Sequence, residues 1–536
     1  MKSRYSFFIL KNFPRLLTQI DRDPDSLTYG SCDRNYWHYK MRDFSSAILQ
    51  QAGLSLALMY KTDFEQNIYY KNENIKNWAI ACVKFWAKIQ NSDGSFNEYY
   101  PFEKGFPPTA FSLLAVANIC GLLNIDDINI KEKILKTAKF LSNHYETSAY
   151  NQELASISAL YRVFLMYGEN WILEGVEKKL QRVLKAFTDD GYFPEQGGAD
   201  IGYLSVSLDM LGQYYDLSKD KRVLPVLEKC LNFLKYFAAP DGSIGGEYGS
   251  RNTIYFLANG LEIALSAGLK EAAFIKEKIY SNFNEINGFM DSIDDRYLTH
   301  YILNSFISAL VKEKETGDKN EIVAGNITLE KTKFFKNSGL VCINNEFYTA
   351  IAALQKGGVI KIFDKLKKKE IFVDCGYRVH IKKGVIACIN WQNPKTYKVW
   401  KKDDTFFVSG YMNKVSQKVS TTFVHLGLRV SSFFLGSKIN HLLKKILILI
   451  DKRTDIYFKR QIEFNNNSVK IIDIVESPKT IELYSAPTLS LRLVASGNFF
   501  APSDLLSKCE SLGLSQRFEI ITTIEFPNLS IKREIK

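Results

Sequence analysis

Three loops of the sequence each combine an Asp-Gly turn with a glutamate a few residues further on. They span residues 93–98, 190–195 and 241–247, and they end in Glu98, Glu195 and Glu247. Two carboxylates that flank a glycosidic bond can hydrolyse it, at a separation of about 5–5.5 Å for retention or about 6.5–9.5 Å for inversion of configuration. The recurring glutamates therefore predict a shared, sugar-directed site. For the aspartates of these loops the alternative is a purely structural role as turn residues.

A glycine-rich loop carries a second set of chemically useful side chains. It reads Glu247-Tyr248-Gly249-Ser250-Arg251-Asn252. The planar guanidinium of Arg251 suits a carboxylate, and exposed loops often hold binding residues. Arg251, Asn252 and Tyr248 are thus candidate substrate-binding residues, together with the three glutamates. The alternative for Arg251 is an ion pair with Glu247 or with a neighbouring loop.

The three Asp-Gly loops recur at a regular spacing that indicates how they are held. Asp190 and Asp241 are 51 residues apart, and Asp93 and Asp190 are 97 apart, close to two such periods. Further members are expected near residue 143, at Asn143-His144-Tyr145-Glu146, and near residue 290, at Asn287-Gly288-Phe289. A period near 50 fits a pair of helices with two loops, and repeated helix pairs close into a ring or a solenoid. The loops would then gather at one end and line a cleft.

The hydrophobic period changes from helical to strand-like along the chain. Up to about residue 315 apolar runs of helical length recur, such as 109–123 after Pro107 and Pro108. After about residue 325 alternating patterns dominate, as in 469–471, 489–493 and 518–526. Residues 356–358 and 465–467 carry turn signals, and 312–318 is the expected linker. We therefore expect a helical domain over residues 1–315, with its ring starting near residue 20, and an all-β domain over residues 325–536.

Composition and charge restrict the class of partner. The 536 residues carry 70 Lys and Arg against 58 Asp and Glu, a net charge of +12, which favours an anionic ligand. We found no nucleotide-binding glycine motif and no nucleic-acid-binding signature, so we expect neither nucleotide nor nucleic acid as a partner. No apolar run reaches the roughly 18 residues of a membrane helix. The longest pure aliphatic stretch, 446–450, has the length of a strand.

The cysteines and the N-terminus bear on the cellular compartment. The eight cysteines are scattered without a CxxC pair, which argues against a disulfide framework and against a thiolate metal site. We therefore expect no metal and no cofactor. The short apolar stretch 5–10 ends at Lys11 and no small-residue cleavage site follows, so we expect no secretory signal and a cytoplasmic protein.

Three stretches of the sequence carry a likeness to a known family. They are Asn151-Gln152-Glu153-Leu154, Asp190-Gly191-Tyr192-Phe193-Pro194-Glu195 continuing to Gly202-Tyr203, and Tyr29-Gly30-Ser31-Cys32-Asp33-Arg34 continuing to Trp37. These stretches resemble the heparinase II/III-like polysaccharide lyases and related alginate and chondroitin lyases. The third is similar to heparinase-like proteins of surface-polysaccharide gene clusters. The resemblance implies an N-terminal (α/α) toroid followed by an antiparallel β-sandwich, and an acidic polysaccharide as substrate.

The resemblance also implies roles for individual residues. Asn151 matches the asparagine that neutralises a uronate carboxylate, and Tyr203 matches the tyrosine that acts at C5 and at the leaving oxygen. Histidines common in the family are replaced here by Gln152 and Leu204. His144 or His300, both near loop-to-helix junctions of the repeat, could supply an imidazole instead. Arg34, in the third stretch, is a further candidate substrate-binding residue.

The implied chemistry is removal of the C5 proton next to a carboxylate. Neutralising the carboxylate stabilises the enolate-like charge, and a general base adds roughly 10²–10⁴-fold. A tyrosine can act as the base only if a cation such as Arg251 lowers its pKa from about 10. Each candidate also has a structural alternative: Asn151 as a helix N-cap, Tyr203 as a core tyrosine, and Asp33 and Arg34 as an ion pair.

Loss of the 4-substituent would make the chain a lyase, which is the function we expect. Return of the proton from the opposite face would make it a uronyl C5-epimerase in surface-polysaccharide biosynthesis. The sequence is also compatible with a glycoside hydrolase on the same toroid and with a glycan-binding protein without activity.

Overall fold

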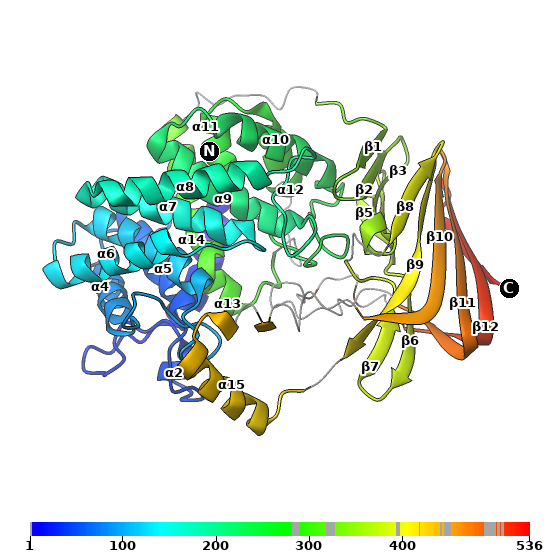
Figure 1. The fold of residues 1–536 in the computed structure, drawn as a ribbon. Coiled ribbons are helices and arrows are strands. Elements are labelled where there is room, and N and C mark those ends of the chain that lie inside the picture. Colours follow the sequence, from blue (N-terminus) through cyan, green and yellow to red (C-terminus); the bar gives the residue numbers. More distant parts are fainter. Residues whose placement is uncertain are drawn as a thin grey trace.

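The computed structural model describes residues 3–280, 290–317, 327–392, 397–416, 419–439, 442–443, 452–486, 500, 504 and 509–536. It has a helical half and a half dominated by β-strands side by side (Figure 1). The second half was expected to be all-β, but it also contains helix α15 (Thr422–Leu435). The expected fold class, an (α/α) toroid followed by an antiparallel β-sandwich, is confirmed.

Within the described residues, six helices pack in a closed inner ring in which each contacts the next and the last contacts the first. In ring order they are α3 (Ala52–Lys61), α5 (Phe106–Leu123), α7 (Tyr150–Tyr167), α9 (Ile201–Ser218), α11 (Asn259–Ser266) and α14 (Leu303–Thr316). Inner helices have neighbours on all sides, so apolar residues occur all around them. In the described part of the chain, α5 alone is long and apolar enough to cross a membrane, and 72% of that stretch is buried in the protein.

The outer helices cover the inner ring with one apolar face each. They are α1 (Arg4–Leu17), α4 (Glu73–Lys88), α6 (Ile128–Asn143), α8 (Asn170–Ala186), α10 (Leu224–Leu234) and α12 (Lys270–Tyr280). In α8 the buried positions include Ile172, Val176, Leu180 and Val183, a helical stripe. Because α1 packs on α14, the ring begins at Arg4 rather than near residue 20.

The Asp-Gly loops serve as tight turns between outer and inner helices. The Asp93 carboxylate accepts hydrogen bonds from the backbone N–H and the hydroxyl of Ser95, and Asp241 does the same for Ser243. Gly94 has φ +90°, and an added Cβ would lie 2.5 Å from the Lys136 carbonyl oxygen. The role of these aspartates as turn residues therefore accounts for the repeat. The expected repeat member at 287–289 lies outside the described residues.

The chain changes from helix to strand between Thr316 and Thr332. Helix α14 continues to Thr316, so residues 312–316 of the expected linker are helical instead. Their sequence, Lys-Glu-Lys-Glu-Thr, consists mostly of good helix formers, so its polarity is that of a helix end and not of a linker. The short helices α2 (Arg34–Trp37) and α13 (Asp295–Tyr297) lie outside the double ring.

Two antiparallel sheets form the β half. The smaller sheet is a meander of β1 (Thr332–Phe335), β2 (Leu340–Asn344), β3 (Tyr348–Ala353), β4 (Val359–Asp364) and β5 (Lys369–Asp374). The larger has the order β10-β9-β7-β6-β11-β12-β13, with β8 paired to β9. Its strands are β6 (Tyr377–Lys382), β7 (Val385–Cys388), β8 (Lys398–Lys402), β9 (Thr405–Ser416), β10 (Arg453–Phe464), β11 (Ser468–Ser485), β12 (Ser511–Glu525) and β13 (Ser530–Ile535).

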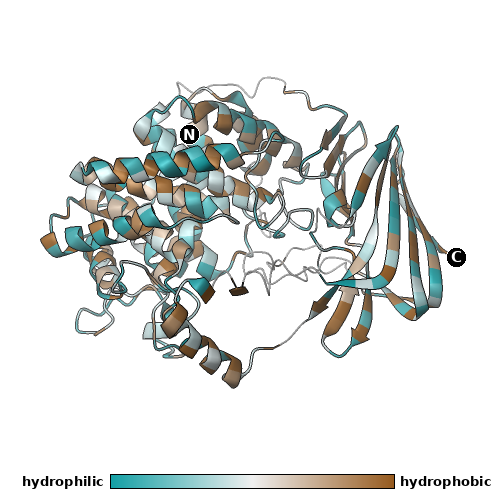
Figure 2. Cartoon of the chain, in the orientation of Figure 1, coloured by the Kyte–Doolittle hydropathy of each residue, from teal (hydrophilic) through white to brown (hydrophobic). Residues whose placement is uncertain are grey.

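The two sheets share one core, which makes the β half a sandwich. Ile343 and Ile362 of the smaller sheet pack in one buried cluster with Phe406, Ile462 and Ile471 of the larger. Alternating hydropathy along the large sheet is visible in Figure 2. The expected strand patterns at 469–471 and 518–526 fall in β11 and in β12 with the turn after it, whereas 489–493 and 446–450 lie outside the described residues.

The sandwich contacts the loops at the end of the toroid. Lys356 donates to the carbonyl oxygens of Glu247 and Gly249 at 2.7 and 2.6 Å, and the Ser338 N–H donates to Asp190 at 2.8 Å. These bonds bring the β half against the same loops that carry the predicted site.

Candidate functional site

The predicted loops gather at the N-terminal ends of the inner helices. Ala149, before α7, forms an isolated β-bridge with Glu195, before α9. Ser250, before α11, donates from its hydroxyl to the Glu195 carbonyl at 2.8 Å. Neighbouring repeats are thus tied together at this end of the ring, and their side chains can act on one ligand.

Asn151, Glu195 and Arg251 form a buried polar chain. The Asn151 amide donates to Glu195 Oε2 at 2.6 Å, and Arg251 Nη1 lies 3.4 Å from Glu195 Oε1. The Arg251 side chain is 11% exposed. Its Nε is buried and has no hydrogen-bond partner among the described residues. Because a guanidinium has five N–H donors and an amide nitrogen has two, this arrangement leaves donors for another carboxylate.

Tyr203 lies between a cation and a second phenol. The Arg251 guanidinium carbon is 5.6 Å from the centre of the Tyr203 ring. Burial lowers the pKa of Arg251, but Tyr203, Glu195, Tyr297 and Asp200 together raise that pKa above its ordinary value. The pKa of Tyr297 is raised well above 10, first by burial and also by charge and hydrogen-bond interactions with Tyr203. Arg251 therefore stays charged beside the tyrosine that the sequence singles out.

Asp200 links the backbones of Tyr203 and Arg251. It is the N-cap of α9, and its Oδ1 accepts the Tyr203 N–H at 3.1 Å. Its Oδ2 accepts the Arg251 N–H at 2.8 Å. One carboxylate thus joins the backbones of the two candidate residues. The sequence signal for Asp200 is that of an N-cap residue just before an apolar helix, and this signal alone does not assign it to the site.

A second charged group, the ion pair of Glu98 and Arg296, lies near Tyr203. Glu98 Oε1 is 2.5 Å from Arg296 Nη2, and the Arg296 guanidinium lies 5.1 Å from the Tyr99 ring centre. Burial raises the pKa of Glu98, whereas Arg296 lowers it; burial is the larger effect. The pKa of Tyr99 is raised by Glu98 first, and Tyr203 is among the smaller causes, so the two groups are electrostatic neighbours. Tyr99 is 55% exposed, which leaves its ring available to a ligand.

The two candidate histidines have different surroundings. His144 is exposed; its ring stacks on Phe140 at 4.0 Å, and its Nδ1 lies 2.8 Å from the Phe140 carbonyl oxygen. His300 is buried in the π-helical turn Leu298–Ile302, and its ring centre lies 6.0 Å from that of Tyr297. Burial, and then Arg296, lower the pKa of His300 well below 6.5. Its Nε2 is buried without a hydrogen-bond partner among the described residues. His300, rather than His144, thus sits beside the tyrosines.

The glycine-rich loop is buried at the domain interface rather than exposed. The Tyr248 hydroxyl accepts the Gly245 N–H at 2.7 Å, and its ring stacks on Phe237. Glu247 pairs with Lys361 at 2.9 Å, and the Asn252 side chain accepts a hydrogen bond from Lys356. In place of the expected contacts with substrate, these three side chains contact the sandwich and the core. Isolated from its fold, the loop looked exposed because the sandwich lysines that cover it lie more than 100 residues away.

Arg34 is the first residue of the short helix α2. Its Nη1 donates to the Thr18 carbonyl at 3.3 Å, and its guanidinium lies 5.3 Å from the Tyr39 ring centre. Asp33 pairs with Arg42 at 3.6 Å instead of with Arg34. Arg42 is among the charges that lower the pKa of Glu98, although burial has the larger, opposite effect there. Arg42, which the sequence analysis did not single out, therefore interacts electrostatically with Glu98.

Other residues that sequence reasoning missed come from the last repeat. Arg296, Tyr297 and Tyr301 belong to α13 and the turn after it, and they lie beside Tyr203 or Glu98. The run Asp294-Asp295-Arg296-Tyr297 begins with an N-cap type residue, and in the structure Asp294 accepts the Tyr297 N–H at 2.8 Å. A search for aromatic and arginine residues at each helix start could have found them.

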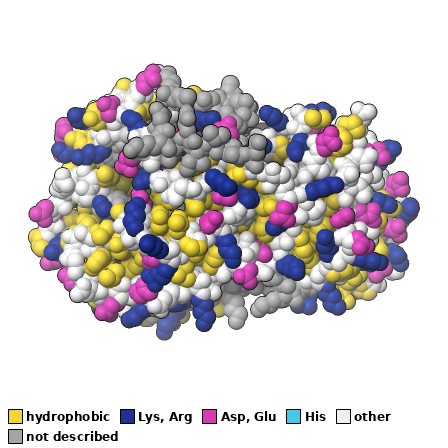
Figure 3. Space-filling model, turned by 90° about the horizontal axis from the view of Figure 1, so that it is seen from above, with side chains coloured by type: hydrophobic (Ala, Val, Ile, Leu, Met, Phe, Trp, Pro, Cys, Tyr) yellow, Lys and Arg dark blue, Asp and Glu magenta, His cyan; other side chains and the backbone are white. Residues whose placement is uncertain are grey.

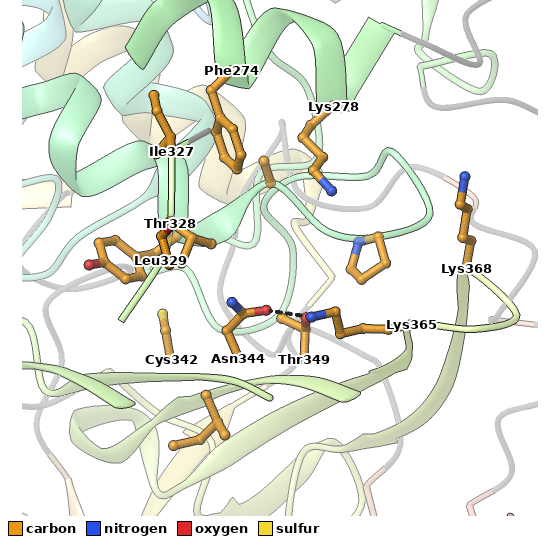
Figure 4. A pocket seen from close by; sticks show the side chains of 14 residues that line it. Phe274, Lys278, Ile327, Thr328, Leu329, Cys342, Asn344, Thr349, Lys365 and Lys368 are labelled. Atoms are coloured by element: carbon orange, nitrogen blue, oxygen red, sulfur yellow. Dashed lines mark hydrogen bonds between the residues drawn. The ribbon is translucent and has the colours of Figure 1, made fainter. Parts of the chain in front are cut away.

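A separate pocket of about 280 Å³ lies between α12, the segment 327–329 and strands β2 and β3 (Figure 4). Lys278, Lys365 and Lys368 surround it, and Lys365 donates to Asn344 Oδ1 at 3.1 Å. The predicted site residues are not part of its lining. In the described part of the chain, no group of three or more His, Cys, Asp or Glu side chains is placed to hold a metal ion.

The excess positive charge is not concentrated on the face seen in Figure 3. There Lys and Arg side chains are spread over both halves, with Asp and Glu side chains between them. Near the predicted site, the described positive charges include Arg251 and Arg296, each paired with a glutamate.

No protein-family model matches the chain, and no curated protein sequence matches it. Among solved structures, the chain is similar to a chondroitin AC lyase from Streptomyces coelicolor A3 in complex with chondroitin sulphate. The two are 9% identical with a TM-score of 0.53, and the match covers 90% of this chain and 67% of the lyase.

Two further structures have lower scores. A mutant of the heparan sulfate lyase HepC from Pedobacter heparinus is 11% identical with a TM-score of 0.42, over 90% of this chain and 70% of that one. A sugar epimerase from a ruminal bacterium is 13% identical with a TM-score of 0.43, over 58% of this chain and 97% of that one. At such identities likeness is a statement about fold, and the chain shares with the chondroitin lyase a helical toroid followed by a β domain.

Proposed function

We propose that the chain is a carbohydrate-active enzyme that acts on a uronate-containing polysaccharide by removing the C5 proton, with β-elimination as the outcome. The observation that carries the proposal is the position of the Arg251 guanidinium, 5.6 Å from the Tyr203 ring and in contact with Glu195. The shared fold with a lyase bound to chondroitin sulphate supports an acidic polysaccharide as the substrate class.

In this mechanism the uronate carboxylate receives hydrogen bonds from Asn151 and Arg251. Both already converge on one carboxylate, that of Glu195, at 2.6 and 3.4 Å. Glu195 orients the two donors, and their remaining N–H groups face the substrate. Donors placed where charge develops are worth about 3–4 kcal/mol each in comparable sites. Neutralising the carboxylate makes the C5 proton acidic enough to remove.

Tyr203 then transfers the proton. As a phenolate it takes the C5 proton, the C5–H electron pair becomes the C4–C5 double bond, and the C4–O bond breaks. The regenerated phenol returns the proton to the leaving oxygen, so one residue acts as base and then as acid. The neighbouring cation, Arg251, favours the phenolate that the first step requires.

An epimerase is the second candidate, and Gln152 and Leu204 motivate it because they replace the histidines common in the lyases. Its reaction shares the first step and differs when the proton returns to C5 before the C4–O bond breaks. A hydrolase is less well supported. Glu98 and Glu195 each pair with an arginine, and Glu247 pairs with Lys361. A hydrolase needs one acid that stays protonated. Burial raises the pKa of Glu247, but Lys361 and its other neighbours bring that pKa below its ordinary value, whereas burial keeps the pKa of Glu98 raised despite Arg296. Of these two glutamates, only Glu98 therefore tends towards the protonated form.

The test is incubation of the full chain with a panel of uronate polymers in deuterated water. Elimination gives an unsaturated uronate that absorbs in the ultraviolet, with new reducing ends. Epimerisation gives deuterium at C5 without ultraviolet absorbance, and hydrolysis gives new reducing ends alone. We expect the first result.

Tyr203→Phe is the critical variant, and Tyr60→Phe is its matched control, because the Tyr60 hydroxyl pairs with Glu73 on the outer surface. We expect Tyr203→Phe to reduce elimination by about 10²–10⁴-fold and the control to remain at the wild-type rate. Full activity of Tyr203→Phe, or new reducing ends without unsaturated product, would refute the proposed mechanism.

A further inference from the structure

Helix α15 (Thr422–Leu435) belongs to the β half by sequence but lies against the toroid (Figure 1). Arg429 pairs with Asp43 at 2.7 Å, and the Ser432 hydroxyl donates to the Pro101 carbonyl at 3.0 Å. The Phe433 ring packs edge-on against Phe102 at 5.1 Å. The polar side of the helix therefore faces the protein.

The opposite side of α15 is an exposed apolar stripe. Phe423, Leu426, Val430 and Phe434 are 86%, 59%, 52% and 77% exposed. Their spacing of three, four and four residues places them in one line along the helix. Figure 2 shows α15 as largely apolar. This reverses the usual arrangement of a surface helix, whose apolar side faces the core.

An exposed apolar stripe of this kind marks a site of interaction with a protein or a membrane. The surrounding sequence indicates which of these two partners is favoured. Residues 405–450 contain no Asp or Glu but carry six basic side chains, Lys414, Lys418, Arg429, Lys438, Lys444 and Lys445. In the described part of this segment, Arg429 lies on α15 and Lys438 follows its end. A second copy seated on the stripe would bring these basic side chains near their counterparts, with no acidic residue on the helix to balance them. An anionic lipid surface complements both the charge and the apolar stripe.

We propose that α15 binds the chain to the surface of an anionic phospholipid bilayer. The helix has 14 residues, about 21 Å, too short to cross a bilayer, so it lies in the plane of the interface. Phe423 and Phe434 enter the acyl-chain boundary, while Arg429 stays at the headgroup level beside Asp43. Apolar insertion with basic attraction is the combination by which interfacial helices hold proteins on membranes. The inference does not depend on the reaction proposed above.

Co-sedimentation of the full chain with vesicles tests this proposal. One set of vesicles contains phosphatidylcholine alone, and the other also contains phosphatidylglycerol. We expect binding to the mixed vesicles only, and weaker binding at high salt, because the charge attraction is screened. The double variant Phe423→Ser/Phe434→Ser should bind at least about tenfold more weakly, since both rings leave the acyl region. Leu366→Ser, at a residue 74% exposed elsewhere, is the control and should bind like the wild type.

A second measurement guards against misfolding of the double variant. In Phe434→Trp, the tryptophan emission, taken as a difference from the wild type, should shift to the blue when mixed vesicles are added. Wild type that stays in the supernatant, a double variant that binds as well as the wild type, or no emission shift overturns the proposal. So does a concentration-dependent dimer, detected by light scattering, that the double variant abolishes in the absence of vesicle binding.

Discussion

The Asn151 amide and the Arg251 guanidinium bind the two oxygens of one carboxylate, that of Glu195, at 2.6 and 3.4 Å. Glu195 comes from the turn before α9, Asn151 from the start of α7 and Arg251 from the loop before α11. Three consecutive repeats thus each contribute one group. The contact turns a repeated loop motif into a site with a defined geometry.

We predict that Glu195→Gln reduces kcat/KM by about 10–100-fold, because Arg251 loses its ion-pair partner and the two donors lose their alignment. The effect should not be additive with Asn151→Ala. A double-mutant cycle measured on kcat/KM should give a coupling of at least about 0.5 kcal/mol. Additive losses would mean that Glu195 and Asn151 act independently.

Asp200 should act as a positioning residue for Tyr203 and Arg251. Asp200→Ala removes the N-cap of α9 and should lower the free energy of unfolding by about 1 kcal/mol or more. Asp200→Asn restores a good N-cap, but its single oxygen cannot accept as many N–H groups as the carboxylate. We therefore expect Asn to recover the stability in denaturant titrations and to leave kcat low. Recovery of both together would indicate a purely structural role.

Glu103 should make the stability of the toroid depend on pH. Burial, and then Glu98, raise the pKa of Glu103 to about 8, although its carboxylate accepts the N–H groups of Glu98 and Tyr99. The folded state holds this proton more tightly than the unfolded state, whose ordinary value is about 4.3. The contribution is complete below that value and is lost as the pH rises through about 8.

Glu103→Gln keeps an acceptor oxygen and removes the titration. We expect the thermal midpoint of the wild type, relative to the variant, to fall between pH 5 and pH 8. Asp63→Asn, on the loop after α3, is the control. A difference between wild type and Glu103→Gln that stays constant over this range would contradict the raised pKa.

Arg460 should be the most sensitive single residue of the sandwich. Its side chain is fully buried and pairs with Asp473 at 2.7 Å and with Asp374 at 2.9 Å. Arg460→Leu leaves two carboxylates buried together, and we expect it to lower the free energy of unfolding by about 3–5 kcal/mol. Arg517→Leu, at an exposed ion pair with Glu476, should change it by less than about 1 kcal/mol. Equal effects in denaturant titrations would show that the network is not a stabilising element.

The sequence alone was sufficient for the order of the two halves and for the kind of element that dominates each, but it did not predict helix α15 within the expected all-β segment. The 51-residue spacing of Asp190 and Asp241 and the alternation in 469–471 predict a helical ring and a sandwich, and the structure has both. Local patterns sufficed because amphipathic periodicity and turn chemistry depend on residues close in sequence. The recurring loops also predicted Glu195 and Arg251 as site residues, whereas Tyr203 was predicted from the resemblance to a known family.

Only the tertiary structure decided which side chains meet. Tyr248 and Asn252 looked like exposed loop residues, but Phe237 and Lys356 cover them. Arg296 and Tyr297 drew no notice, yet they lie against Glu98 and Tyr203. The reason is physical: ring closure and the packing of the sandwich join residues that are far apart in sequence, such as Asn252 with Lys356 and Glu98 with Arg296. The periodicity of a single segment carries no record of those contacts.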